Sequence, residues 1–223
     1  MLRSLNELVG YAVHEADGRI GVVRDFLINR DSWKVTYLEI DLTDWYPGKK
    51  VIVPPTRINI PEGSLHQVPV TLTKQEVLDS PALELDEEVC RQHEEDLALH
   101  FGWSPCFISP DDKHVNLKSL REIVDYDIRA LDGSLGHIED FIIDDQAWVV
   151  RYVVVRTANW LPGKRVLMAP EWISSVIWEE NNVVVGHTRE EIKNGPTYDP
   201  DTAIHRSYET ELYQHFGQPT YWE

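Results

Sequence analysis

The chain is one sequence written twice. Residues 2–108 align with residues 117–223 without a gap, so that each residue of the first copy meets the residue 115 positions further on. About a third of the aligned positions are identical. We call the two copies repeat 1 and repeat 2. A fold or a site that is proposed in one repeat must therefore be weighed against its counterpart in the other.

The repeated motifs divide the chain into two domains. Each repeat is large enough to bury a core of its own. The expected domains are residues 1–108 and 117–223, joined by a linker at 109–116 that contains Pro110 and Asp111-Asp112. The matching motifs are Leu2-Arg3-Ser4-Leu5 with Leu117-Lys118-Ser119-Leu120, Asp17-Gly18 with Asp132-Gly133, Trp33 with Trp148, Trp45–Lys49 with Trp160–Lys164, and His100–Gly102 with His215–Gly217.

The charge of the chain limits its partners. The formal net charge is −17, and it is spread over both halves: residues 1–115 carry 11 basic and 20 acidic side chains, and residues 116–223 carry 10 and 18. Such a surface repels nucleic-acid phosphates and anionic lipid heads. We therefore expect no nucleic-acid partner, and solubility alone is a sufficient reason for the charge.

The sequence predicts a cytoplasmic protein. No apolar run approaches the ~20 residues of a membrane-spanning helix, and the first residues lack a secretory apolar core. The only two cysteines, Cys90 and Cys106, have His205 and Tyr221 at their matching positions, which does not favour a disulfide framework.

Within each repeat, strands come first and helices last. In repeat 1 we expect strands over 11–15, 20–29, 33–41, 50–53 and 66–71, separated by turns such as Asp17-Gly18 and Pro47-Gly48. Gly21 and Gly136 are expected to mark a bulge or bend. About six short strands with close turns suggest a small barrel.

Helices follow the strands in both repeats. Thr73 and Thr188 each begin a capping-box pattern for a short helix that stops before a proline. A longer helix is expected over 87–101 and over 203–216, ended by Gly102 and Gly217 in the left-handed conformation.

The strand motifs resemble the PRC-barrel family. The resemblance rests on the Leu-(Arg/Lys)-Ser-Leu start, on Asp-Gly-x-(Leu/Ile)-Gly followed by Asp25-Phe26 or Asp140-Phe141, and on Trp-x-Val-x-Tyr at Trp33 and Trp148. It covers about residues 2–72 and 117–187.

The resemblance implies a fold more than a chemistry. It implies a mainly β fold with α (α+β): two tandem small PRC-type β-barrels, each followed by a short and a longer helix, related by a pseudo-twofold axis. PRC-barrels occur in the H subunit of photosynthetic reaction centres, in a ribosome maturation factor and in many bacterial proteins, and they mostly act as docking or assembly modules. No functional residue can be carried over from them, and fold alone does not give function. The duplication would mimic a dimer of a one-repeat ancestor, and a homodimer of this chain stays open.

Two paired histidines are the first candidate site. His100 and His215 precede Phe-Gly at the ends of the longer helices, and Glu94 and Glu209 lie six residues before them. One interpretation is a metal or proton-relay site. The other, which we favour, is a histidine that stabilises a helix C-terminus beside an internal Arg–Glu pair.

Repeated carboxylates are the second candidate. Asp25 and Asp140 could perform acid–base chemistry in a cleft, or they could bond a nearby backbone or hydroxyl group. We favour the structural interpretation.

The turns that contain Pro-Gly are the third candidate. They carry the only repeated basic doublets of this acidic chain, next to aromatic and apolar residues, which suggests an exposed recognition tip. Alternatively, the aromatic residues cap the barrel and the cations extend over them. The tip residues are Trp45, Tyr46, Lys49, Lys50, Trp160, Leu161, Lys164 and Arg165.

No stronger chemical motif is found. The sequence lacks a glycine-rich phosphate loop, His-Glu-x-x-His, Cys-x-x-Cys and Gly-x-Ser-x-Gly. We therefore predict a non-enzymatic protein-interaction or assembly module with a protein partner and with no catalytic, cofactor or metal residues. A small-molecule- or metal-responsive sensor is the first alternative, and an enzyme is the second.

Overall fold

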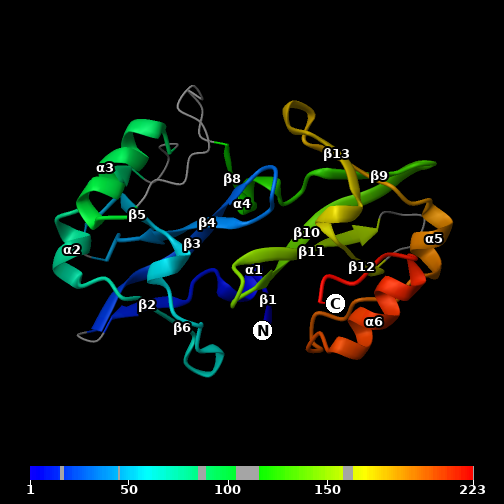
Figure 1. Ribbon diagram of the computed structural model, residues 1–223, viewed down its shortest axis with the longest axis horizontal. Helices are drawn as coiled ribbons and strands as arrows, with labels where there is room; N and C mark the ends of the chain where they lie inside the picture. The colour runs from blue at the N-terminus through cyan, green and yellow to red at the C-terminus, as the bar shows by residue number, and fades with distance from the viewer. Residues whose placement is uncertain (16–17, 45, 85–88, 104–115, 158–162, 223) are drawn as a thin grey trace. The chain divides into compact units, whose positions relative to one another are not determined.

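The computed structural model describes residues 1–15, 18–44, 46–84, 89–103, 116–157 and 163–222 (Figure 1). The chain divides into two compact units. We name each after its longest strand. The β3 unit comprises Asn6–Arg121 with Asp145–Val149, and the β10 unit comprises Met1–Leu5, Glu122–Asp144 and Val150–Glu223. The predicted tip residues Trp45, Trp160 and Leu161, and most of the predicted linker, lie outside the described residues.

The described part of the β3 unit contains one mixed sheet together with short or medium helices. Its sheet has the order β6-β2-β3-β4-β5-β7, with β8 paired to β3. The elements are α1 (Leu5–Leu8), β2 (Ala12–Glu15), β3 (Gly18–Asn29), β4 (Val35–Asp41), β5 (Lys49–Val53), β6 (Gln67–Pro69), α2 (Lys74–Leu78), β7 (Leu83–Glu84), α3 (Arg91–Phe101) and β8 (Leu117–Ser119), with short 3₁₀ turns at Pro55–Arg57 and Gly63–Leu65.

The β10 unit repeats this plan. Its sheet has the order β12-β11-β10-β9-β14-β13, with β1 paired to β10. The elements are β1 (Leu2–Ser4), α4 (Leu120–Ile123), β9 (Asp127–Ala130), β10 (Gly133–Asp144), β11 (Val149–Thr157), β12 (Arg165–Met168), β13 (Ile173–Ile177), β14 (Asn182–Val185), α5 (Arg189–Asn194) and α6 (Arg206–His215), with 3₁₀ turns at Pro170–Trp172 and Trp178–Glu180.

Each sheet has seven strands, and among the described residues neither sheet is closed into a barrel. The mainly β fold with helices is confirmed, whereas the closed tandem barrels are not seen. Neighbouring strands are antiparallel except for β2 with β6 and β9 with β14, which are parallel. The core of the β3 unit centres on Phe26 and Tyr37, and that of the β10 unit on Phe141 and Tyr152.

The short N-terminal strands of the two repeats are exchanged. Strand β1, the first segment of repeat 1, pairs with β10 of repeat 2, with Ser4 opposite Ile142. Strand β8, its counterpart in repeat 2, pairs with β3 of repeat 1, with Ser119 opposite Leu27. Figure 1 shows β1 beside β10 and β8 beside β3. Each compact unit is therefore completed by a segment from the other repeat.

The predicted bulges near Gly21 and Gly136 are confirmed. The register of β2 with β3, and of β9 with β10, shifts next to these glycines. A Cβ atom on Gly21 would lie 2.3 Å from the carbonyl oxygen of Asp41, and one on Gly136 would lie 2.0 Å from that of Arg156. Only glycine lets the neighbouring strands approach this closely.

The strand expected to begin at Trp33 begins instead at Val35. Trp33 and its counterpart Trp148 have φ angles of 55° and 48°, in the left-handed region. The reason is a turn closed by Asn29, whose side-chain oxygen accepts hydrogen bonds from the backbone N–H groups of Asp31 and Ser32. Side chains with this local bonding compete with strand formation.

The helices mostly follow the sequence pattern. Thr73 and Thr188 both form the predicted capping boxes, and Gly102 and Gly217 have positive φ as predicted. The longer helix of repeat 1 begins at Arg91, later than expected, because Cys90 before it is extended. Among the helices that the structure describes, none has both the length and the apolar character needed to cross a membrane.

Candidate functional site

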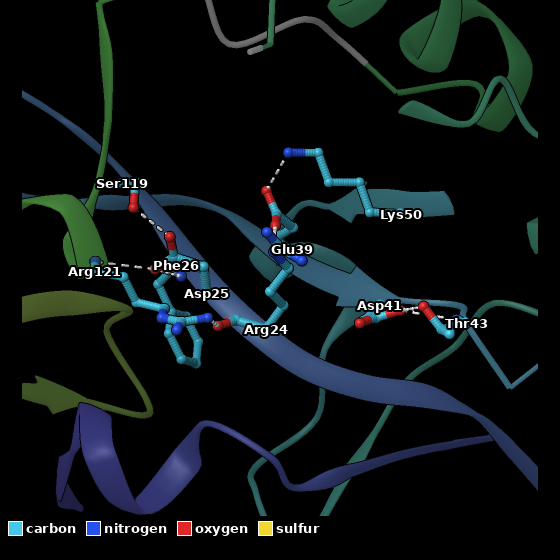
Figure 2. A network of polar contacts seen from close by, with 9 residues as sticks. All are labelled: Arg24, Asp25, Phe26, Glu39, Asp41, Thr43, Lys50, Ser119 and Arg121. Atoms are coloured by element: carbon cyan, nitrogen blue, oxygen red, sulfur yellow. Dashed lines mark hydrogen bonds and ion pairs between the residues drawn. The ribbon is translucent and has the colours of Figure 1, made fainter. Parts of the chain in front are cut away.

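The repeated aspartates hold the exchanged strands. In the β3 unit, Asp25 accepts hydrogen bonds from the Ser119 hydroxyl and from the backbone N–H of Phe26, the latter at 2.7 Å (Figure 2). In the β10 unit, Asp140 accepts from the Ser4 hydroxyl and from the backbone N–H of Phe141. The predicted bonds of Asp25 and Asp140 to a nearby backbone or hydroxyl group are confirmed, and each serine comes from the other repeat.

Asp25 is buried, and this changes its acidity. Burial raises the pKa of Asp25 from 3.8 to about 6. The hydrogen bonds from Ser119 and Phe26 lower this pKa, and the nearby Glu39 carboxylate raises it. Its titration is therefore tied to the docking of β8.

The repeated glutamates fasten the longer helices to the sheets. Glu94 on α3 accepts a hydrogen bond from the hydroxyl of Tyr37 on β4, and Glu209 on α6 accepts one from Tyr152 on β11 at 2.7 Å. Both glutamates are buried. Burial raises the pKa of the Tyr152 phenol, as does its hydrogen bond to Glu209. Each glutamate therefore bonds a tyrosine of its own sheet.

The repeated histidines bind main-chain carbonyl groups. His100 Nε2 lies 2.9 Å from the carbonyl oxygen of Glu76, and His215 Nε2 lies 2.8 Å from that of Glu191. Each contact joins a long helix to the short helix before it. Within the described part of the chain, no three His, Cys, Asp or Glu side chains are grouped as a metal site would require.

Lys50, predicted at an exposed tip, is buried in the β3 unit. Its Nζ atom lies 3.0 Å from a carboxylate oxygen of Glu39, which also pairs with Arg24 at 2.8 Å (Figure 2). A buried carboxylate between two cations is a structural arrangement. Lys50 therefore cannot serve in an exposed tip.

The counterpart of Lys50 is also paired, but with a different strand. Arg165 contacts Glu139 on β10 through two guanidinium nitrogens, and Arg156 approaches the same carboxylate at 3.4 Å. Hydrogen bonding to Arg165 lowers the pKa of Glu139. Glu139 on β10 is the counterpart of Arg24 on β3. The carboxylate that binds the basic side chains is therefore Glu39 on β4 in the β3 unit, and Glu139 on β10, the counterpart of β3, in the β10 unit.

Lys49 and Lys164 occupy matching positions but make different contacts. Lys164 Nζ donates to the carbonyl oxygens of Lys193, at 2.6 Å, and Gly195, at 2.7 Å, at the C-terminal end of α5. Burial lowers the pKa of Lys164. Lys49 instead pairs with the Glu84 carboxylate on β7.

A cavity of about 130 Å³ lies beside Lys49 in the β3 unit. Tyr46 and Leu78, which line it, are 47% and 38% exposed. Tyr46 is a residue of the predicted tip, whereas Leu78 belongs to α2. The lining residues are Leu42, Tyr46, Lys49, Val77, Leu78, Ser80 and Ala82.

The sequence interpretation missed several partners of the repeated groups. Tyr37, Tyr152, Ser4 and Ser119 are each repeated at the 115-residue spacing, and this spacing was the available signal. Their pairing depends on tertiary contacts over long sequence separations, which no local pattern reports.

Comparison with models of protein families finds a match in repeat 1. The model of the PRC-barrel domain matches residues 2–70. None of the curated proteins matches the chain.

Proposed function

We propose that this chain is a non-enzymatic docking or assembly module that binds a protein partner, and the match of the PRC-barrel domain model to residues 2–70 supports this. The proposal includes the tandem, pseudo-twofold arrangement expected from the repeat and a cytoplasmic location. The binding surface, which we call the Tyr46 surface, consists of Tyr46 before β5, Lys49 at the start of β5 and Leu78 at the end of α2.

The observation that carries the proposal is the exposure of Tyr46 and Leu78 over a cavity. Large apolar side chains that stay open to solvent beside a hollow are typical of protein-binding sites. The matching positions in the β10 unit are Leu161 and Lys193, and Lys193 offers a charged side chain in place of Leu78. The surface is therefore a property of the β3 unit.

The roles of the repeated polar groups also support a docking module over an enzyme or a metal sensor. Asp25, Glu94 and His100 each bond a group that holds a strand or helix in place. The same is true of their counterparts in the β10 unit. A group used in this way is less available for catalysis or for a ligand.

Site-directed photocrosslinking tests the proposal. A benzoylphenylalanine side chain in place of Tyr46 should form a discrete crosslinked species in extract of the native cells, identified by mass spectrometry. The matched control carries the same group at Leu131, which is 64% exposed in a turn of the β10 unit.

The outcomes are distinct. A species formed from position 46 but not from position 131 supports a partner at the Tyr46 surface. The same species from both positions, or none from either, overturns the proposed surface. Replacing Lys164 is unsuitable as a test, since Lys164 holds the end of α5 and its loss would disturb folding.

A further inference from the structure

The two repeats differ in what fills the space after the short helix. In the β10 unit, the ammonium group of Lys164 lies at the C-terminal end of α5, against the carbonyl oxygens of Lys193 and Gly195. In the β3 unit, the residues at these two carbonyl positions are Leu78 and Ser80, and both line the cavity of about 130 Å³. The cavity thus occupies the place that a lysine side chain fills in the other unit.

Lys49 is kept from this place by Glu84. Lys49 is the counterpart of Lys164, but its ammonium group pairs with the Glu84 carboxylate. The counterpart of Glu84 is Asp199, which accepts hydrogen bonds from the backbone N–H of Asp201 and the hydroxyl of Thr202 in its own turn. The different partners of these two carboxylates accompany the difference between the filled site and the open one.

The walls of the cavity suit an alkylammonium group. Leu42, Val77 and Ala82 provide an apolar lining for a carbon chain. The end of a helix favours a positive charge, because the last carbonyl groups carry partial negative charge. Tyr46, at the exposed margin, offers an aromatic face to a cation. The volume is well below the roughly 300 Å³ at which small-molecule pockets begin, so one side chain fits better than a whole metabolite.

We propose that this cavity receives a lysine side chain of the protein partner. The inference rests on the proposed docking function and specifies the chemistry of the partner. The net charge of −17 favours the approach of a basic polypeptide. The pairing of Lys49 with Glu84 offsets the positive charge beside the site.

The test uses n-butylammonium as the probe with the full-length chain. Added in a titration, it should shift the NMR methyl signals of Leu42, Val77 and Leu78, with a dissociation constant on the order of 10 mM for so small a probe. Neutral n-butanol, which has nearly the same shape, should bind at least about tenfold more weakly, since the charge is what the helix end recognises.

Two variants make the test specific. Glu84→Gln releases Lys49, which should then enter the cavity as Lys164 does in the β10 unit and abolish butylammonium binding. The double variant Lys49→Met/Glu84→Gln removes the competing amine and should restore binding to within about threefold. Neither side chain is buried, so the fold should persist, and unchanged methyl signals in the β3 unit away from the cavity verify this.

Two results would overturn the inference: no localised shifts with butylammonium, or equal binding by butylammonium and butanol. Binding that Glu84→Gln leaves intact would also contradict it. If butylammonium fails to bind while position 46 still forms a specific crosslink, the docking function stands and only the lysine-receiving cavity is wrong. If butylammonium binds but no crosslink forms, the cavity stands and the proposed docking function fails.

Discussion

Asp25 is the residue whose ionisation is most closely tied to the fold. Its pKa of about 6 lies above the 3.8 of the free carboxyl group, so the folded state binds its proton more tightly than the unfolded chain does. The resulting stabilisation is complete below about pH 3.8 and is lost as the pH rises through 6. The full difference corresponds to about 3 kcal/mol in the free energy of unfolding.

Replacing Ser119 by Ala should raise the pKa of Asp25 further. The Ser119 hydroxyl donates to the charged carboxylate, and its loss removes a stabiliser of the ionised form. Titration of the Asp25 side-chain carbon signal by NMR should give a midpoint near 6 in the original chain and a higher one in Ser119→Ala. Ser4→Ala, which alters the matching bond to Asp140, serves as the control and should leave the Asp25 midpoint in place. A midpoint near 4 in the original chain would contradict the assignment.

Gly136 is expected to tolerate no side chain. A Cβ atom there would lie 2.0 Å from the Arg156 carbonyl oxygen, on the neighbouring strand, and φ is 156°. Gly136→Ala should therefore reduce the free energy of unfolding by about 3 kcal/mol or more, measured by urea denaturation. Gly163→Ala is the control: φ is 81°, but the site is open, and a loss of about 1 kcal/mol is expected. Equal losses in the two variants would show that the close approach of the strands is not what requires glycine at Gly136.

At the scale of the elements, the matching residues Lys164 and Lys49 differ in whether they bond the end of a helix. Lys164 donates to two carbonyl groups at the C-terminal end of α5, whereas Lys49 pairs with the exposed carboxylate of Glu84. Lys164→Met should lower the free energy of unfolding by about 1–2 kcal/mol, and it should speed amide hydrogen exchange in α5. Lys49→Met should change the stability by less than about 0.5 kcal/mol, because exposed pairs contribute little. Equal effects from the two variants would contradict the assigned contacts.

The elements also show how far the sequence predicts this fold. Capping boxes at Thr73 and Thr188 and the glycines that end the long helices involve only neighbouring residues, and the structure confirms them. Trp33 was wrongly predicted in a strand, because the side chain of Asn29 closes a turn that competes with extended backbone. Short-range sequence patterns predict the local structure correctly unless a side chain forms hydrogen bonds with the backbone that compete with that structure.

The candidate site was harder to predict for a different reason. Lys50 belongs to a basic doublet that was predicted to be exposed. It is buried instead, and it pairs with Glu39 on the neighbouring strand. The serines that bind Asp25 and Asp140 come from the opposite repeat. Such pairings depend on which strands are neighbours, and residue spacing along one strand carries no information about that.

At the scale of the whole molecule, the exchange of β1 and β8 separates the units of structure from the units of sequence. Strand β1 belongs to repeat 1 but completes the β10 unit, while β8 belongs to repeat 2 and completes the β3 unit. A change at the N-terminus of repeat 1 should therefore act on the stability of repeat 2. Cutting the chain at the boundary between the repeats would deprive both halves of a strand.

Deleting Leu2–Ser4 tests this exchange directly. Loss of β1 exposes the edge of β10 and leaves Asp140 without the Ser4 hydroxyl, so amides of Ile142–Asp144 should exchange faster by at least about tenfold. Amides of Leu27–Asn29, which face β8, should keep their protection. Hydrogen exchange followed by mass spectrometry resolves the two strands in one sample. Faster exchange at Leu27–Asn29 with no change at Ile142–Asp144 would mean that each repeat keeps its own first strand, and the two units would then coincide with the two repeats.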